Sequence, residues 1–229
     1  PEYIELAIRH AVSGIPGPAF LEIPMDIFMG SVDEEVVIPK IRTEPPRLSP
    51  DQDEVRSALD LLRQAKRPML MAGTSVKWSK ASADMNRFIS ETHIPTYTNG
   101  MGRGSVPHDS PEFLNRSRRD ALKKLDLIIL AGTLLDFRMR FGQTIPATAK
   151  IIQLDMDATL IGQNRQTDVP LVGNLACSFR ALSDEMKTQG MRLDFSPWRD
   201  ELRAIENAEE KKVEASLNSD EVPIDPQRM

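Results

Sequence analysis

The feature that most constrains the fold is an apolar run at residues 127–131, which lies between Asp126 and Gly132. A run of this length is typical of a parallel strand that is buried on both faces, although a short buried helix has the same pattern. Gly132 allows the backbone to turn sharply after the run, and open α/β sheets bind ligands at the carboxyl ends of their strands. The run therefore predicts a buried strand followed by a ligand-binding loop.

Further short apolar runs alternate with segments of helical periodicity. Such an alternation predicts parallel pairing, because right-handed crossovers place helices on both faces of a sheet. We therefore expect an α/β protein with a Rossmann-like parallel sheet of about six strands. The predicted strands are residues 19–23, 68–73, 94–98, 127–131, 150–155 and 169–173. The predicted helices are residues 2–12, 50–66, 78–91, 114–125, 174–187 and 198–215.

Composition divides the chain into four parts. The helix and strand within residues 1–30 do not make a core of their own, so we expect them to be the tail of a preceding domain. Residues 31–48 contain several prolines and mixed charge, which favours an extended linker. Residues 49–190 are the expected central domain. We expect residues 191–229 to be a charged, solvated linker helix and the start of a further domain, so that both ends of the sequence look cut.

The start of one helix is predicted in detail. Residues 49–52 have the pattern of a capping box, with Ser49 as the cap and Pro50 at the first helical position. The apolar residues that follow recur at helical spacing. We therefore expect Ser49 to cap a helix that ends near Lys66.

The composition argues against several classes of protein. The formal charge of -5 is spread over both signs, so we expect no nucleic-acid partner and no membrane partner. No apolar stretch approaches the roughly 20 residues of a membrane span. The single cysteine, Cys177, excludes an internal disulfide framework and is typical of a reducing, cytoplasmic location. With three scattered histidines and one cysteine, we expect no metal site of the structural zinc kind.

Several motifs follow one another in order, at residues 66–73, 99–104 with 106–107, 126–138 and 154–157. In this order and approximate spacing they resemble the central domain of thiamine diphosphate-dependent enzymes related to acetolactate synthase large subunits and 2-hydroxyacyl-CoA lyases. Residues 17–26 are similar to the strand that closes the first, pyrimidine-binding domain of that family. Residues 119–124, followed by 132–138, look most similar to the acetolactate synthase-like branch. The resemblance covers nearly the whole chain.

The resemblance implies a parent enzyme that is a transferase or lyase acting on 2-oxo or 2-hydroxy acids. In the family, thiamine diphosphate lies between the first and third domains, and a Gly-Asp-Gly motif of the third domain holds magnesium and the diphosphate. This sequence contains no Gly-Asp-Gly, and residues 223–228 resemble only the entry to the third domain. We therefore expect the cofactor, the magnesium and the substrate contacts outside this chain, no catalytic residue within it, and no activity of the chain alone. The parent is expected to be a homodimer or homotetramer.

The resemblance also implies a nucleotide-binding role for the central domain. Acetolactate synthases hold FAD across it, several acyl-CoA enzymes hold ADP or the nucleotide end of CoA, and other members leave it empty. Glycines at strand ends allow backbone amides to approach phosphates, and a carboxylate at the next strand end can bind a ribose hydroxyl. We expect Thr133 and Arg138 at the diphosphate and Asp155 or Asp157 at ribose or adenine. The full set of predicted binding residues is Gly73, Thr98, Gly100, Met101, Gly102, Gly132, Thr133, Asp136, Arg138, Asp155 and Asp157.

Each of these residues also has a purely structural interpretation. The loop at residues 100–104 fits an ordinary tight turn, Arg138 fits a surface ion pair, and Asp155 fits a helix cap. A basic run is interpreted mainly as a solvated helix face, with anion binding as the lesser alternative. That run is Arg116, Arg118, Arg119, Lys123 and Lys124. For the whole chain, the alternatives are a structural spacer that supports oligomer contacts and a sirtuin-type NAD enzyme, and the missing zinc cysteines argue against the latter.

Overall fold

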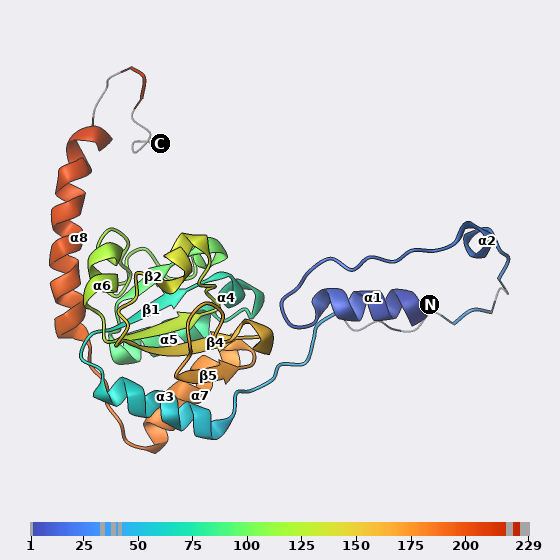
Figure 1. Cartoon of the computed structure of the whole chain (residues 1–229), viewed down its shortest axis with the longest axis horizontal. Helices are drawn as coiled ribbons and strands as arrows, with labels where there is room; N and C mark the ends of the chain where they lie inside the picture. The colour runs from blue at the N-terminus through green and yellow to red at the C-terminus, as the bar shows by residue number, and fades with distance from the viewer. Residues whose placement is uncertain (1, 33–34, 38–39, 41–42, 219–221, 225–229) are drawn as a thin grey trace. The chain divides into compact units, whose positions relative to one another are not determined.

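The computed structural model describes residues 2–32, 35–37, 40, 43–218 and 222–224. Contacts divide the chain into two compact units, residues 1–47 and residues 48–229 (Figure 1). No helix of the described residues is long and apolar enough to cross a membrane.

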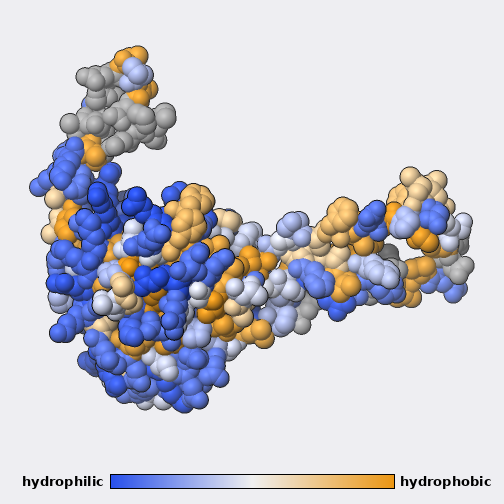
Figure 2. Space-filling model, viewed as in Figure 1, coloured by the Kyte–Doolittle hydropathy of each residue, from blue (hydrophilic) through white to orange (hydrophobic). Residues whose placement is uncertain are grey.

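The first unit contains two helices, α1 (Glu2–Val12) and α2 (Met25–Phe28). The helix predicted at residues 2–12 is confirmed, but the strand predicted at residues 19–23 is wrong, because these residues form no strand. A strand needs a neighbour to satisfy its backbone groups, and the described residues of this unit contain no other strand. Helix α1 buries none of its residues, and hydrophobic residues are visible on the surface of this unit (Figure 2).

The second unit is built on one five-stranded parallel sheet with the strand order β2-β1-β3-β4-β5. The expected Rossmann-like α/β fold is thereby confirmed. The sheet has one strand fewer than the six predicted, because residues 19–23 do not contribute. The strands are β1 (Pro68–Ala72), β2 (Thr96–Thr98), β3 (Leu127–Ala131), β4 (Lys150–Asp155) and β5 (Val169–Val172).

The register brings the carboxyl ends of the strands to one level. Ala72 of β1 pairs with Ala131 of β3, and Ala131 pairs with Leu154 of β4. The chain leaves β1 for β2 on one side and then returns across β1 to β3 on the other side. The connections of β1 and β3 therefore diverge, and this arrangement defines a topological switch point, where open α/β sheets bind ligands.

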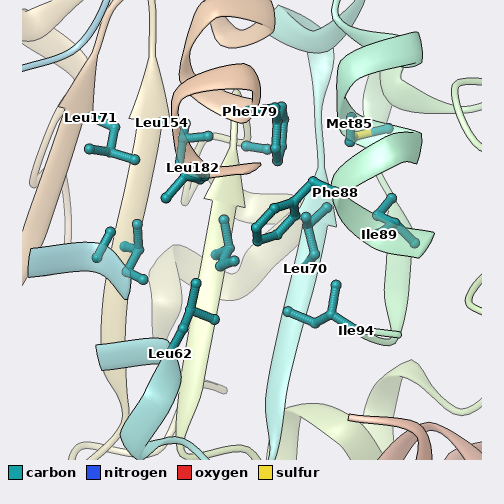
Figure 3. Close-up of a cluster of buried hydrophobic side chains, with 14 of the residues drawn as sticks. Leu62, Leu70, Met85, Phe88, Ile89, Ile94, Leu154, Leu171, Phe179 and Leu182 are labelled. Atoms are coloured by element: carbon teal, nitrogen blue, oxygen red, sulfur yellow. The ribbon is translucent and has the colours of Figure 1, made fainter. Parts of the chain in front are cut away.

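Helices cover both faces of the sheet, and alternate residues of each strand point to opposite faces. On one face, Leu70 and Ile129 belong to a core that includes Phe88 and Phe179, whose rings lie 5.7 Å apart (Figure 3). The helices of this face are α3 (Gln52–Gln64), α4 (Thr74–Trp78), α5 (Ser82–Thr92) and α7 (Leu175–Thr188). On the opposite face, Met69 and Ile128 pack with α6 (Arg118–Lys124) and α8 (Ser196–Leu217).

Two predicted helices begin four residues later than expected. The helix predicted at residues 78–91 begins only at Ser82, as α5, because α4 ends at Trp78 and the chain turns at Lys80, whose φ is +53°. The helix predicted at residues 114–125 begins only at Arg118. In its first part, Leu114 donates a backbone hydrogen bond to Thr96 of β2 at 3.0 Å, and residues 115–117 then form a bend and a turn.

The predicted cap of α3 is wrong. Asp51, not Ser49, precedes the helix and accepts hydrogen bonds from the backbone amides of Asp53 at 2.8 Å and Glu54 at 3.3 Å. Both serine and aspartate are good caps, so residue type alone does not distinguish the two positions. Pro50 consequently lies before the cap and not in the first turn.

Helix α8 is confirmed, but the prediction that it is solvated is wrong for one of its faces. The face of α8 that packs toward the sheet buries Trp198, Leu202 and Glu206. The indole nitrogen of Trp198 donates a hydrogen bond to the carbonyl oxygen of Pro68 at 3.1 Å, at the start of β1. Because charged residues lie between these positions, the buried face of the helix is hard to recognise in the sequence.

Candidate functional site

The loops after β1 and β3 meet at the switch point through two glycines. Gly73 donates a hydrogen bond to the carbonyl oxygen of Ala131 at 2.8 Å. A Cβ atom at Gly73 would lie 2.2 Å from the carbonyl oxygen of Gly132, and a Cβ atom at Gly132 would lie 2.4 Å from Cβ of Ser75. Gly73 was predicted to allow a close backbone approach to a ligand and Gly132 a sharp turn, and here the two loops approach each other.

The loop after β2 folds over the end of β1. The backbone amide of Asn99 donates to the carbonyl oxygen of Ala72 at 2.8 Å, and a Cβ atom at Gly102 would lie only 2.3 Å from that same oxygen. Gly100 has a φ of +52°, and the amide of Met101 donates to Thr74 Oγ1 at 3.4 Å. Thr98 is half-buried at the end of β2. The predicted residues of this loop therefore lie beside the glycine contact of β1.

Thr133 faces into the end of the sheet. Its side chain is buried, and Oγ1 donates a hydrogen bond to the carbonyl oxygen of Met71 at 3.0 Å. The hydroxyl thus satisfies a backbone acceptor of β1 and fixes the loop after β3 against it.

Asp136 and Arg138 form a pair where the chain enters the 3-10 helix η2 (Phe137–Gly142). One oxygen of Asp136 accepts from the backbone amide of Arg138 at 2.9 Å, and the other accepts from Nε at 2.9 Å and Nη2 at 2.5 Å. The Arg138 guanidinium holds the pKa of Asp136 below its usual range, and the carboxylate raises the pKa of Arg138. Arg138 also approaches the loop after β2, because its Nη1 would lie 3.6 Å from a Cβ atom at Gly100.

Asp155 is a buried carboxylate at the end of β4. Its Oδ1 accepts from the amides of Met156 at 2.7 Å and Asp157 at 3.3 Å, and from the hydroxyl of Ser75 at 3.4 Å. Its Oδ2 is buried and has no hydrogen-bond partner in the described part of the chain. Burial raises the pKa of Asp155 above its ordinary value, because the charged form loses hydration.

Asp157, by contrast, is used locally. Its Oδ1 accepts from the backbone amide of Thr159 at 2.8 Å and from the Thr159 hydroxyl at 2.7 Å, so that it caps the 3-10 helix η3 (Ala158–Leu160). The structure therefore joins Asp155 to the loop after β1, while the hydrogen bonds of Asp157 remain within its own turn.

Two features of this edge were missed from the sequence. Ser75 connects the loops, since its hydroxyl reaches Asp155 and its amide donates to the carbonyl oxygen of Gly132 at 3.4 Å. The sequence pattern that could have indicated the role of Ser75 is a Thr-Ser pair directly after the glycine that ends a strand. The second feature is a hollow of about 610 Å³ beside Arg138, which we call the basic hollow. It is lined by Arg118, Arg119, Leu122, Lys123, Arg138, Met139, Arg140 and Thr144.

The described residues bring no comparable group of metal ligands together. Among the described residues, no group of three or more histidine, cysteine, aspartate or glutamate side chains is placed to hold a metal ion.

Comparison with known proteins identifies the family. Residues 55–182 match the family described as "Thiamine pyrophosphate enzyme, central domain". The chain belongs to this family. The resemblance found in the sequence is thereby confirmed.

Relatives of this thiamine pyrophosphate enzyme domain include enzymes with several activities. The chain is 34% identical over 227 residues to the acetolactate synthase large subunit of Mycobacterium tuberculosis, covering 99% of this chain and 40% of that protein. It is 29% identical over 222 residues to oxalyl-CoA decarboxylase of Escherichia coli, covering 95% and 39%. It is 29% identical over 205 residues to human 2-hydroxyacyl-CoA lyase 1, covering 86% and 34%. The chain therefore spans 34% to 40% of the length of these relatives.

A solved structure supports the fold. The X-ray structure of a Mycobacterium smegmatis protein described as a thiamin diphosphate-dependent enzyme matches with a TM-score of 0.65 at 22% identity. The match covers 80% of this chain and 36% of that one.

Proposed function

We propose that this chain is the central part of a thiamine diphosphate-dependent carbon–carbon synthase or lyase that acts on 2-oxo or 2-hydroxy acids. The names of its relatives, which include acetolactate synthase and 2-hydroxyacyl-CoA lyase, support this class. Thiamine diphosphate and magnesium would be held by other parts of such an enzyme, and we derive no step through them here. The parent is proposed to be a cytoplasmic homodimer or homotetramer.

The role we propose for the chain itself is to bind a nucleotide at the carboxyl edge of the sheet. One observation carries this proposal: the three glycine-containing loops after β1, β2 and β3 converge at the switch point, beside the guanidinium of Arg138. The cation beside these glycine turns suits the phosphates of FAD, ADP or CoA. The unpartnered Oδ2 of Asp155 is a further polar atom of this edge.

Thermal unfolding of the chain with FAD, ADP and CoA tests the nucleotide role. A ligand that binds only the folded chain raises its stability, by about 2.7 kcal/mol at a concentration of 100 times its Kd. We expect at least one of the three compounds to raise the Tm. If none of them does so at millimolar concentration, the chain is not a nucleotide-binding domain.

A pair of arginine variants locates the effect. Arg138→Gln should reduce the rise in Tm, because it removes the cation beside Gly100. Arg180→Gln is the matched control, since Arg180 also pairs with one aspartate, Asp84, and has a similar side-chain exposure of 49% against 48%. Equal effects of the two variants would place the ligand elsewhere.

The alternative role is a structural spacer that supports contacts between subunits. The pairing of Arg138 with Asp136 favours it, because the cation is already neutralised within the protein. A spacer would show no nucleotide effect, and Arg138→Gln would then change only the Tm of the free chain.

We also propose that the chain alone does not catalyse. Incubation with pyruvate, thiamine diphosphate and magnesium should give no decarboxylation or acetolactate above a reaction without protein. Turnover that scales with the concentration of the chain would contradict this assignment.

A further inference from the structure

The basic hollow lies between α6 and the segment after β3. Leu122 and Met139 are buried at its floor, and its other lining residues are mainly cationic. Figure 2 shows strongly hydrophilic residues over the region where Figure 1 labels α6. Its volume of about 610 Å³ lies within the range of small-molecule sites. The hollow is therefore large enough for a charged group and the part of a ligand attached to it.

Most of the positive charge of the basic hollow has no paired carboxylate in the described part of the chain. Arg138 is the exception, because it is paired with Asp136. Among the described residues, no side-chain hydrogen bond or ion pair is made by Arg118, Arg119, Lys123 or Arg140. Like charges that line one concave surface raise the local potential and attract anions, even in a chain with a net charge of -5. The arrangement favours a ligand with more than one negative charge.

Arg140 is held at this hollow by an unusual backbone. Arg140 and Phe141 have φ values of +48° and +52°, which residues other than glycine rarely adopt. Each such residue costs on the order of 1 kcal/mol, so the surrounding structure must impose the conformation. Gly142, with a φ of +77°, completes the turn.

The chemistry of the cations indicates the anion. Arginine presents a planar fork of donors that matches phosphate oxygens, and lysine adds a point charge. A phosphate monoester carries about -1.5 to -2 charges at neutral pH and offers three acceptor oxygens. Each phosphate inside a dinucleotide such as FAD is bonded on two sides, to a sugar alcohol and to the other phosphate, and has fewer free oxygens. The basic hollow therefore suits a terminal phosphate better than an internal one.

Arg138 connects the basic hollow to the switch point, because it lines the hollow and also lies beside Gly100. We propose that the basic hollow is the binding subsite for a terminal phosphate group, and that the nucleotide of this domain carries one, as ADP and CoA do and FAD does not. The choice of nucleotide rests on the proposed function, whereas anion binding by the hollow does not.

Titration calorimetry of the 229-residue chain tests the subsite. The ligands are ADP, CoA, dephospho-CoA, FAD and inorganic phosphate. We expect ADP and CoA to bind at least about tenfold more tightly than dephospho-CoA and FAD, since each tenfold corresponds to only 1.4 kcal/mol. ADP binding without CoA binding, or the reverse, identifies the source of the terminal phosphate. FAD binding as tightly as either would overturn the choice of nucleotide.

Two double variants of the same basic run provide the matched comparison. Arg119→Gln with Lys123→Gln removes two exposed cations that line the basic hollow. Arg116→Gln with Lys124→Gln removes the same charge from residues outside it, of which Lys124 is ion-paired with Glu201 at 2.9 Å. The first should weaken ADP, CoA and inorganic phosphate by about tenfold or more, and the second should stay within about twofold of the parent chain.

The outcomes separate the two proposals. If nucleotides bind and both double variants bind them equally, the subsite is overturned while the nucleotide role stands. If inorganic phosphate binds through Arg119 and Lys123 but no nucleotide binds, the subsite stands and the nucleotide role is overturned. If single-stranded RNA binds and both double variants weaken it alike, the basic run acts as an unspecific charged face and the subsite is overturned.

Discussion

At the scale of single residues, the edge of the sheet depends on glycines that have no room for a side chain. The close approach of Gly73 to Gly132 depends on the register of β1 against β3, which no local pattern contains. The sequence therefore predicted both glycines as loop residues, but not that they contact each other. Thr133 was predicted as a ligand-binding residue, and the sequence did not predict that its hydroxyl donates a hydrogen bond to the carbonyl oxygen of Met71.

Gly73→Ala should destabilise the chain strongly. Its Cβ atom would lie 2.2 Å from the carbonyl oxygen of Gly132, so β1 and β3 must separate, at a cost of about 3 kcal/mol. Gly104→Ala is the control: its φ of +80° is unfavourable for alanine, at about 1 kcal/mol, but its Cβ atom would meet no atom within 4 Å. Urea unfolding measures both variants. Equal losses would mean that the two loops are not in contact.

Asp155→Asn should leave the chain at least as stable at neutral pH. Burial raises the folded-state pKa of Asp155, so ionisation of this group opposes folding as the pH rises above its unfolded pKa, about 3.9. Asparagine avoids that cost and keeps an oxygen for the amides of Met156 and Asp157. Urea unfolding should show the relative advantage of the variant at pH 7 and its disappearance near pH 3. If the variant is less stable than the parent chain by the same amount at pH 7 and at pH 3, burial of the Asp155 charge does not cost stability.

At the scale of secondary structure, the buried parallel strands were predictable because both of their faces are apolar. Four of the five strands of the sheet match predicted runs to within one residue, and β2 is shorter than its run by two residues. The helix boundaries were less predictable because tertiary contacts decide them. The late start of α6 goes with the backbone hydrogen bond from Leu114 to Thr96, which is distant in sequence.

Helix α8 is joined to the start of α6 by Glu206, which sequence reasoning placed on a solvated helix. This carboxylate is buried and accepts from the backbone amides of Asn115 at 3.0 Å, Arg116 at 2.7 Å and Ser117 at 2.8 Å, and from the Ser117 hydroxyl at 2.8 Å. Burial alone would raise the pKa of Glu206, but these hydrogen bonds lower it overall. The start of α6 therefore depends on a residue of α8.

Glu206→Gln should cost about 1–3 kcal/mol at pH 7, because the amide has one oxygen for three backbone donors and the Ser117 hydroxyl. The lowered pKa means that Glu206 stabilises the chain above its unfolded pKa, and that this contribution is lost as the pH falls through the folded value. Urea unfolding between pH 7 and pH 3 should show the two proteins converging at the acidic end. Glu210→Gln, at an exposed position of the same helix, should change little. A constant difference across the range would mean that the charge of Glu206 is not used.

At the scale of the whole molecule, the sheet order concentrates the polar groups of distant segments at one edge. Residues from the ends of β1, β2, β3 and β4 come together there, whereas the opposite end of the sheet carries Asp126, which binds the amides of Lys66 and Arg67 at 2.8 Å and 2.9 Å. The predicted site residues lie at this edge because they follow predicted strands. The basic hollow was not found, because α6 and the segment after β3 meet only in the folded chain.

The central claim is that a nucleotide binds at this carboxyl edge, and backbone amide NMR tests it most directly. On addition of ADP to the ¹⁵N-labelled chain, we predict shift changes at Gly73, Gly100 and Gly132, together with Arg138. The amides of Lys66 and Arg67, at the opposite end of the sheet, should not shift. Saturable shifts confined to that opposite end, or no shifts at millimolar ADP, CoA and FAD, would contradict the claim.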